Sequence, residues 1–288
     1  MTRRLGFVLA VIAASAVLLG TASHTLNAAR LGNLQFYMWK AIGGKAHGGQ
    51  YVAVNNIRLY YETYGSGRPV LVLHGGLEAS SMNMHYQIRA LAAKWFVIAP
   101  DSRAHGRSTD GDEPLSYRLM ADDMVQLLDH LGVERVDVVG WSDGGIIGLD
   151  LAMRHPERVG RLVVIGANYD VDGLISVPIP KTVIPPPTSF YARNAPDPSH
   201  WPVLYRKVIE MWRTQPRYTL ADLKKIQAPT LVVAGEFDAI KREHTEQLAR
   251  AIPNSKLDIV AGGTHALLGD KSDIVNADIL RFLDEQSP

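Results

Sequence analysis

The sequence has no cysteine among its 288 residues. Disulfide bonds, thiolate nucleophiles and cysteine-based metal sites are therefore excluded. Net charge is nearly absent too, because 30 basic residues balance 29 acidic ones to give +1 at pH 7. A chain with this balance lacks the positive field that nucleic-acid binding requires, so we expect no nucleic-acid partner. The sequence also lacks repeats, low-complexity tracts and metal-ligand clusters, and we expect neither a metal nor an organic cofactor.

Composition and length indicate a globular protein. Hydrophobic residues make up 47% of the chain and charged residues 20%, which is the usual balance for a folded domain. A chain of 288 residues is long enough to bury the core of one large α/β domain. These quantities do not determine the oligomeric state.

The N-terminus carries the pattern of an export signal. Arg3 and Arg4 precede an uncharged apolar run over residues 5–20, and residues 20–22 are small enough for signal-peptidase cleavage. The length of the run allows both a cleaved signal peptide and an uncleaved membrane anchor. We expect residues 1–22 to be one of the two. The protein is then exported: periplasmic, secreted, or anchored to the membrane by residues 5–20.

Residues 23–49 are expected to form a connector between this segment and the folded domain. They include Tyr37 and Trp39 in an apolar stretch, which suits either an interfacial helix on a membrane or packing against the domain. Glycine-rich residues 43–49 indicate a flexible break. We therefore place the domain at residues 50–288.

From residue 51 on, apolar runs typical of strands buried on both faces alternate with stretches of helical apolar spacing. The predicted strands cover residues 52–54, 57–64, 70–73, 95–99, 136–139, 162–165, 230–234 and 257–260, and the predicted helices cover residues 84–93, 117–131, 146–154, 243–251 and 273–285. This order predicts an α/β fold with a mostly parallel sheet covered by helices on both faces.

The connection between residues 165 and 230 interrupts this alternation. Its first part is dense in proline, and its second part, residues 203–213, has helical spacing and aromatic side chains. Connections of this length within a compact domain are usually functional. We predict a small cap over the mouth of a pocket at about residues 168–225.

The pattern Gly-x-Ser-x-Gly occurs at residues 140–144, between a predicted strand and a predicted helix. A serine on such a sharp turn has a strained backbone, and its hydroxyl stands above the sheet edge. Gly140 and Gly144 flank the turn because side chains there would clash with neighbouring backbone. Ser142 is therefore the candidate nucleophile.

A serine nucleophile needs a base, and the base needs an acid to orient it. In this architecture the order along the chain is serine, acid, histidine. Asp238 and His265 follow in that order, each just after a predicted strand, so the parallel sheet brings them to the same edge. Asp170 is the alternative acid, and Glu236 is a weaker one.

Acyl transfer also requires N–H donors for the developing oxyanion. One is expected from Asp143, the residue after the nucleophile. The second is expected from Gly76 in the loop after residues 70–73, with Leu77 as the alternative. His74 is expected to brace this loop. The residues expected to contact the substrate are Leu77, Trp141, Asp143 and Trp212.

These motifs resemble those of the α/β-hydrolase fold superfamily, and they occur in its order. They are the oxyanion loop at residues 74–76, the D-x-R-G-x-G-x-S turn at residues 100–108, the nucleophile elbow at residues 140–144, and the acid and histidine loops at residues 235–238 and 262–265. Ala104 departs from the pattern, because glycine is usual there. The resemblance implies an α/β-hydrolase fold, with the cap inserted between strands 6 and 7.

Residues 140–146 and 165–168 are also similar to those of the valacyclovir-hydrolase-like group of amino-acid ester hydrolases. In that group the acid beside the nucleophile is associated with recognition of the substrate's amino group. The resemblance implies this role for Asp143. The alternative is that the Asp143 side chain only makes hydrogen bonds within the elbow.

The sequence predicts an enzyme that cleaves a small carboxylic ester through an acyl-enzyme, with Ser142, His265 and Asp238 as its triad. The same groups could cleave an activated C–C bond, a lactone, an amide or a peptide. A non-catalytic binding protein on this scaffold is the alternative from a different class.

Overall fold

The structure is a computed structural model that describes residues 46–77, 79, 83–175, 184 and 186–285. The predicted signal or anchor (residues 1–22), most of the predicted connector and residues 176–183 of the predicted cap lie outside these ranges. Within the described ranges, no helix is both long and apolar enough to cross a membrane.

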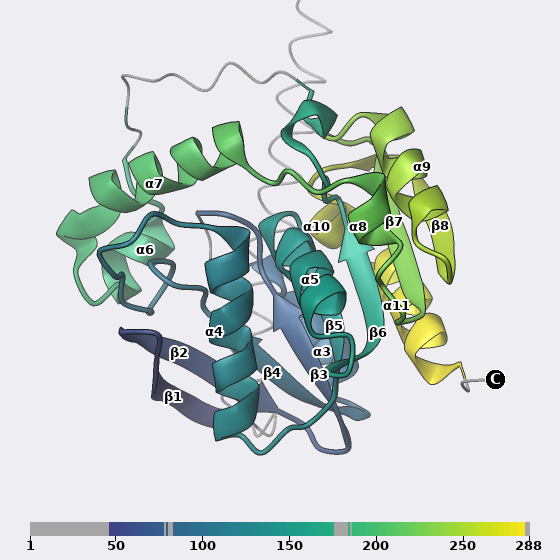
Figure 1. Cartoon of the computed structure of the whole chain (residues 1–288). Coiled ribbons are helices and arrows are strands. Elements are labelled where there is room, and N and C mark those ends of the chain that lie inside the picture. The colour runs from purple at the N-terminus through teal and green to yellow at the C-terminus, as the bar shows by residue number, and fades with distance from the viewer. Residues whose placement is uncertain (1–45, 78, 80–82, 176–183, 185, 286–288) are drawn as a thin grey trace, which may run out of the picture. The chain divides into compact units, whose positions relative to one another are not determined.

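An 8-stranded sheet forms the centre of the described domain, with the strand order β1-β2-β4-β3-β5-β6-β7-β8 (Figure 1). Its strands are β1 (Ala46–Val54), β2 (Ile57–Tyr64), β3 (Arg68–Leu73), β4 (Trp95–Pro100), β5 (Val136–Trp141), β6 (Val159–Ile165), β7 (Thr230–Phe237) and β8 (Ser255–Thr264). In the described sheet the pairs β1–β2 and β2–β4 are antiparallel, and all the pairs from β4 to β8 are parallel. The predicted mostly parallel sheet is confirmed.

β1 begins at Ala46, earlier than the domain start expected at Gln50. Part of the glycine-rich stretch is thus a strand and not a break. Ala46 pairs with Tyr64, and the register shifts between His47 and Gln50, which is the irregularity that glycines accommodate in a strand. A Cβ at Gly49 would overlap the ring of Tyr60 on β2. These glycines let the two strands pair closely.

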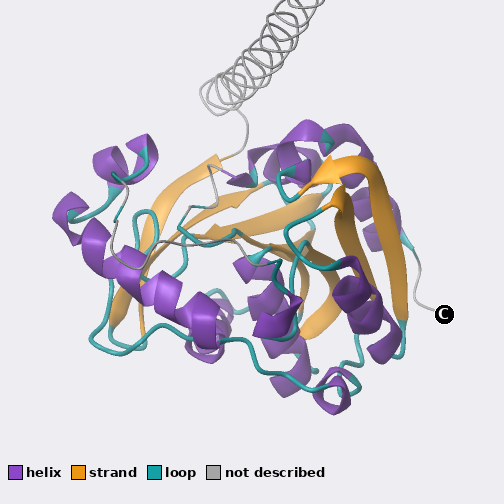
Figure 2. Ribbon diagram, turned by 90° about the horizontal axis from the view of Figure 1, so that it is seen from above, coloured by secondary structure: helices purple, strands orange, loops and turns teal. Residues whose placement is uncertain are grey.

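Helices cover both faces of the twisted sheet, as the view from above in Figure 2 shows. α4 (Tyr117–His130) and α5 (Asp143–Arg154) pack together on one face, while α3 (His85–Leu91) and α11 (Ser272–Asp284) pack together on the other. α9 (Arg242–Ala251) lies against β7 and β8, and the short α10 (Leu267–Asp270) precedes α11. The predicted helix positions are confirmed to within a few residues at each end.

The core lies between these layers. The inner strands β3, β5 and β6 are buried along most of their length, because helices cover both of their faces. Their Val, Leu and Ile side chains pack against the apolar stripes of α4 and α5. Burying this surface is the main driving force for folding, and it fixes the carboxyl ends of the parallel strands at one edge.

The connection between β6 and β7 carries the elements predicted to form a cap. Among its described residues are the 3-10 turns η1 (Val171–Gly173) and η2 (Pro198–His200) and the helices α6 (Ser189–Asn194), α7 (Trp201–Thr214) and α8 (Leu220–Leu223). α7 runs across the carboxyl edge above α4 (Figure 1). Lys207 on α7 and His200 both contact the buried carboxylate of Asp110, at 2.8 and 2.7 Å. These contacts fasten the insertion to the loop that precedes α4.

α5 approaches β3 closely at Gly144. A Cβ at Gly144 would overlap the carbonyl group of Leu73 and lie 2.7 Å from the carbonyl oxygen of His74, and these are backbone atoms that cannot move aside as a flexible side chain can. Gly144→Ala should lower the free energy of unfolding by about 3 kcal/mol in urea denaturation. Gly269→Ala in α10 is the matched control, because no atom lies within 4 Å of its added Cβ. Equal stability of the two variants would contradict this packing.

Candidate active site

Ser142 stands on a sharp turn between β5 and α5. Its backbone has φ 54° and ψ −120°, a strained combination for a residue other than glycine. The turn is held by the N–H of Ser142, which donates to the carbonyl of Ile165 on β6 at 2.8 Å. A Cβ at Gly140 would overlap the backbone of Gly144. The side-chain-free positions on both sides therefore permit the turn, and the serine hydroxyl is presented at the sheet edge.

His265 connects Ser142 to Asp238 through hydrogen bonds. The Ser142 hydroxyl lies 3.1 Å from His265 Nε2, and His265 Nδ1 lies 2.8 Å from Asp238 Oδ1. In this arrangement Nδ1–H donates to the carboxylate and Nε2 is left to accept from the serine. The imidazole side chain is 31% exposed, whereas that of Asp238 is 2% exposed. The structure thus brings the three predicted residues together in one hydrogen-bonded row.

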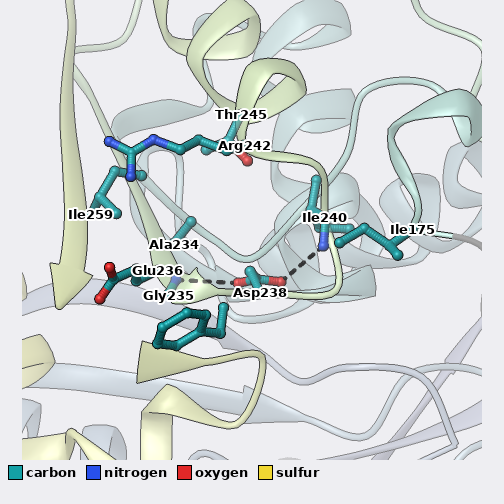
Figure 3. A pocket seen from close by; sticks show the side chains of 10 residues that line it. Ile175, Ala234, Gly235, Glu236, Asp238, Ile240, Arg242, Thr245 and Ile259 are labelled. Atoms are coloured by element: carbon teal, nitrogen blue, oxygen red, sulfur yellow. Dashed lines mark hydrogen bonds between the residues drawn. The ribbon is translucent and has the colours of Figure 1, made fainter. Parts of the chain in front are cut away.

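Asp238 is oriented by backbone donors of its own loop. The N–H of Ile240 donates to Oδ1 at 3.2 Å and the N–H of Gly235 donates to Oδ2 at 3.3 Å (Figure 3). Neither alternative acid contacts the imidazole in the hydrogen bonds described. Asp170 accepts from the N–H of Asp172 and pairs with Arg217.

Glu236 has a separate place in the site. Its carboxylate accepts a 2.8 Å hydrogen bond from the N–H of Gly262, so it ties the acid loop to the histidine loop. The predicted strands end at residues 234 and 260, with loops directly after them. In the structure β7 continues to Phe237 and β8 to Thr264, and these two residues pair with each other. A Cβ at Gly235 would lie 2.5 Å from the backbone of Gly263. Paired glycines let the two strand ends approach one another closely.

The predicted oxyanion loop lies directly over the nucleophile. A Cβ at Gly75 would lie 3.3 Å from Cβ of Ser142, and a Cβ at Gly76 would overlap the carboxylate of Asp143. The loop then turns at Leu77, which has φ 62°. Gly76 and Asp143, the two expected N–H donors, are therefore neighbours on one side of the serine.

His74 braces this loop, as expected. Its Nε2 accepts from the N–H of Ser102 at 2.9 Å, and its Nδ1 lies 2.7 Å from the carbonyl of Gly75. Burial lowers the pKa of His74, and it lowers the pKa of the neighbouring His105 to about 3. Both rings are thus neutral near pH 7, and they hold the surrounding backbone through hydrogen bonds.

The turn at residues 100–108 is held by buried ion pairs. Arg103 donates to both carboxylate oxygens of Asp123 at 2.6 Å, and Arg107 pairs with Asp101 at 2.7 Å. Ala104, the departure from the family pattern, has φ 65°. It keeps the left-handed conformation that glycine would adopt with less strain.

The side chain of Asp143 is buried beside the nucleophile and lacks a cationic partner among its described hydrogen bonds. Tyr117 Oη donates to Oδ1 at 2.9 Å, and Trp212 Nε1 on α7 lies 2.9 and 3.0 Å from the two carboxylate oxygens. Burial raises the pKa of this carboxyl to about 6, although both donors and the nearby His265 oppose the shift. The two neutral donors thus compensate the burial of this charge only in part.

The four residues expected to contact the substrate do not all lie together in the structure. Asp143 and Trp212 contact each other, and Trp212 also lies against Gly76. The indole of Trp141 is directed to the histidine loop, because its Nε1 donates to the carbonyl oxygen of His265 at 3.0 Å. Leu77 is part of the turn after the oxyanion loop and is partly buried against the core.

Sequence reasoning missed two further residues of the site. Tyr117 on α4 donates to Asp143, and a phenol at the start of an amphipathic helix gave no signal of this contact. Gly166 after β6 has φ 56°, and a Cβ there would lie 3.1 Å from Asp238 Oδ2 and 3.2 Å from His265 Nδ1. A glycine directly after a buried strand was the available signal. Among the described residues, no group of three or more His, Asp or Glu side chains could hold a metal ion.

Comparison with known proteins agrees with this geometry. The family model of the alpha/beta hydrolase fold matches residues 68–187. The chain is 32% identical over 269 residues to "Putative carbamate hydrolase RutD" of Azorhizobium caulinodans, a match that covers 83% of this chain and 98% of that relative. The chain belongs to the α/β-hydrolase fold family. It is a hydrolase.

Further relatives agree with this assignment. The hydrolase is 30% identical to the serine hydrolase BPHL of Homo sapiens, over 75% of this chain and 79% of the human protein. Its fold is similar to that of a membrane phospholipase A, with a TM-score of 0.70 and 21% identity over 99% of this chain and 98% of that one. The latter similarity concerns the fold alone.

The raised pKa of Asp143 makes stability depend on pH. Between the ordinary pKa of 3.8 and the raised value of about 6, the folded protein keeps a proton that the unfolded chain has lost. The free energy of unfolding therefore falls as the pH rises through this window. From pH 4 to pH 7, we expect this fall to be smaller in Asp143→Asn than in the parent by about 2 kcal/mol.

Urea denaturation at the two pH values tests this expectation. The matched control is Asp112→Asn, which changes an exposed carboxylate in the loop before α4 and should keep the parent's pH dependence. If Asp143→Asn keeps the parent's pH dependence, ionisation of the buried carboxylate does not lower the free energy of unfolding.

Proposed function

We propose that this hydrolase cleaves a small carboxylic ester in two acyl-transfer steps, with Ser142 as nucleophile, His265 as base and Asp238 as the acid that orients it. The observation that carries the proposal is the continuous row of hydrogen bonds from Ser142 Oγ through the imidazole to the Asp238 carboxylate. Each polar atom in this row has the partner that the chemistry requires.

In the first step, Ser142 Oγ attacks the ester carbonyl carbon while its proton passes to His265 Nε2. The carbonyl π electrons move to oxygen, and the resulting imidazolium is stabilised by Asp238. When the tetrahedral intermediate collapses, the bond to the alkoxy group breaks and His265 returns the proton to the leaving oxygen. The products of this step are an alcohol and an acyl-Ser142 ester.

In the second step, a water molecule gives a proton to His265 Nε2 and its oxygen attacks the acyl carbon. Collapse of this intermediate breaks the bond to Ser142 Oγ, which recovers the proton, and a carboxylic acid leaves. The oxyanion of both intermediates is bound by the N–H groups of Gly76 and Asp143. Asp143 is the first residue of α5, so the partial positive charge of the helix N-terminus acts at the same place.

Other acyl compounds are compatible with these groups. The relative whose name reads "Putative carbamate hydrolase RutD" supports an amide or carbamate as the main alternative to an ester, and a lactone or an activated C–C bond is the third alternative. A non-catalytic binding protein is disfavoured, because binding alone gives no reason for a strained serine to face an acid-oriented imidazole.

The environment of Asp143 supports a cationic acyl group in the substrate. A buried carboxylate whose described donors are the neutral groups of Tyr117 and Trp212 gains interaction energy when an ammonium group approaches, because the surroundings screen charge poorly. A neutral substrate gives no such gain. We therefore expect aminoacyl esters to react faster than their neutral analogues.

Labelling with a fluorophosphonate tests the nucleophile. The full-length chain should be labelled covalently, Ser142→Ala should not be labelled at all, and His265→Ala should react at least about a hundredfold more slowly because no base takes the serine proton. Ser199→Ala, which alters a serine in η2, is the matched control and should label normally. If the folded parent protein is not labelled and hydrolyses none of the aryl, alkyl and aminoacyl esters, the triad has no hydrolytic role.

The selectivity for a cationic acyl group should depend on pH. Above the raised pKa of Asp143, about 6, the carboxylate is charged and attracts the ammonium group, and below it the attraction is lost. The ratio of kcat/KM for an aminoacyl ester to that for its neutral isostere should therefore rise from pH 5 to pH 7 by about tenfold. In Asp143→Asn the ratio should be low and flat. A ratio that is the same in both proteins would assign Asp143 to hydrogen bonding within the elbow.

A further inference from the structure

Trp141, the last residue of β5, lies against the oxyanion loop and the histidine loop. It precedes Ser142 in the chain, and a Cβ at Gly75 in the oxyanion loop would lie 2.8 Å from its ring. Its indole Nε1 donates to the carbonyl oxygen of His265 at 3.0 Å. A substrate-lining role alone would not direct the one polar atom of the indole to the backbone of the histidine.

Among the described side-chain hydrogen bonds, that of Trp141 is the one that reaches the main chain of His265 itself. The His265 side chain is 31% exposed, and the histidine loop lies between the end of β8 at Thr264 and the start of α10 at Leu267. The Thr264 hydroxyl accepts from the N–H of Ala266 at 3.1 Å and so holds the main chain just after the histidine, while the side-chain bonds to Ser142 and Asp238 fix the two ring nitrogens of His265. The indole N–H fixes the backbone at the same residue, and Glu236 fixes the loop at Gly262.

The ring of Trp141 also lies beside the imidazole. The two ring centroids are 5.3 Å apart, with an angle of 38° between the planes. His265 becomes positively charged in each acyl-transfer step, and an indole within about 6 Å attracts a cation through its quadrupole. The same side chain therefore restricts the histidine before the reaction and favours its charged form during the reaction.

We propose that Trp141 is the positioning residue of the catalytic histidine: its N–H holds the main chain of His265, and its ring packs beside the imidazole that takes the proton from Ser142. This inference rests on the proposed function. It assigns to Trp141 an effect on the rate of acyl transfer and not on substrate affinity, whereas a residue that only lined the pocket would act on affinity.

The decisive change removes the N–H and preserves the shape. Incorporation of β-(3-benzothienyl)alanine at position 141 of the full-length chain replaces the N–H by sulfur, and Trp141→Phe provides a second variant that lacks the donor. Trp95→Phe is the control, because Trp95 begins β4 at the opposite end of the parallel strands. For each protein, kcat, KM, the rate of fluorophosphonate labelling and the melting temperature are measured.

We expect kcat and the labelling rate to fall roughly tenfold in both position-141 variants, the factor that one lost hydrogen bond gives. KM should stay within about twofold of the parent value, because the substrate contacts are retained. Trp95→Phe should keep the parent's kcat and labelling rate, even where its melting temperature falls. The benzothienyl variant should melt within a few degrees of the parent, which separates the effect from unfolding.

Two results would overturn the positioning role. Either unchanged kcat and labelling in the benzothienyl variant, or a raised KM with unchanged kcat, would show that the indole N–H does not act through His265. In both cases the parent protein labels at Ser142 and the proposed function stands. A parent protein that does not label would instead remove the proposed function, and the positioning role with it.

Discussion

Direct contact of backbone with backbone at the carboxyl edge of the sheet is the constraint on which the site depends. α5 approaches β3 so closely that a Cβ at Gly144 would overlap the Leu73 carbonyl, and the ends of β7 and β8 meet at Gly235 and Gly263. These approaches set the spacing between the serine, the acid and the histidine. The glycines permit these close backbone contacts, and the side chains in the rest of the domain pack around them.

The buried carboxylates of the domain differ in the groups that donate hydrogen bonds to them. Asp123 and Asp101 are paired with Arg103 and Arg107 and hold the turn at residues 100–108. Among the described residues, Asp143, next to Ser142, accepts side-chain hydrogen bonds from Tyr117 and Trp212. Burial raises the pKa of Asp123 even beside Arg103, and it raises that of Asp143, which has neutral donors, to about 6. The fold therefore carries an energetic cost at the buried carboxylate beside Ser142.

The sequence predicted the parallel sheet and the main helices because apolar runs and helical spacing report burial directly. It also predicted that Ser142, Asp238 and His265 would meet, since each follows its own strand and parallel strands end at the same edge. It did not predict that β7 and β8 continue to Phe237 and Thr264. Glycines in those stretches indicate turns, and only the tertiary pairing makes them strands.

Contacts between distant side chains were beyond the reach of sequence reasoning. The bonds from Tyr117 to Asp143 and from Trp141 to the His265 carbonyl join residues far apart in the chain, and no periodicity records such pairs. The early start of β1 was missed for a related reason. Gly49 is needed to admit the ring of Tyr60, a requirement that becomes visible only when both strands are in place.

The bond between Trp212 and Asp143 has a consequence for how this enzyme can diverge. Trp212 belongs to the insertion between β6 and β7, whereas Asp143 opens the helix behind the nucleophile. The insertion and the catalytic scaffold therefore share a polar contact and are not independent modules. Exchange of the insertion for that of another hydrolase would leave Asp143 without its indole donor, so a compatible residue at position 143 would have to be exchanged with it.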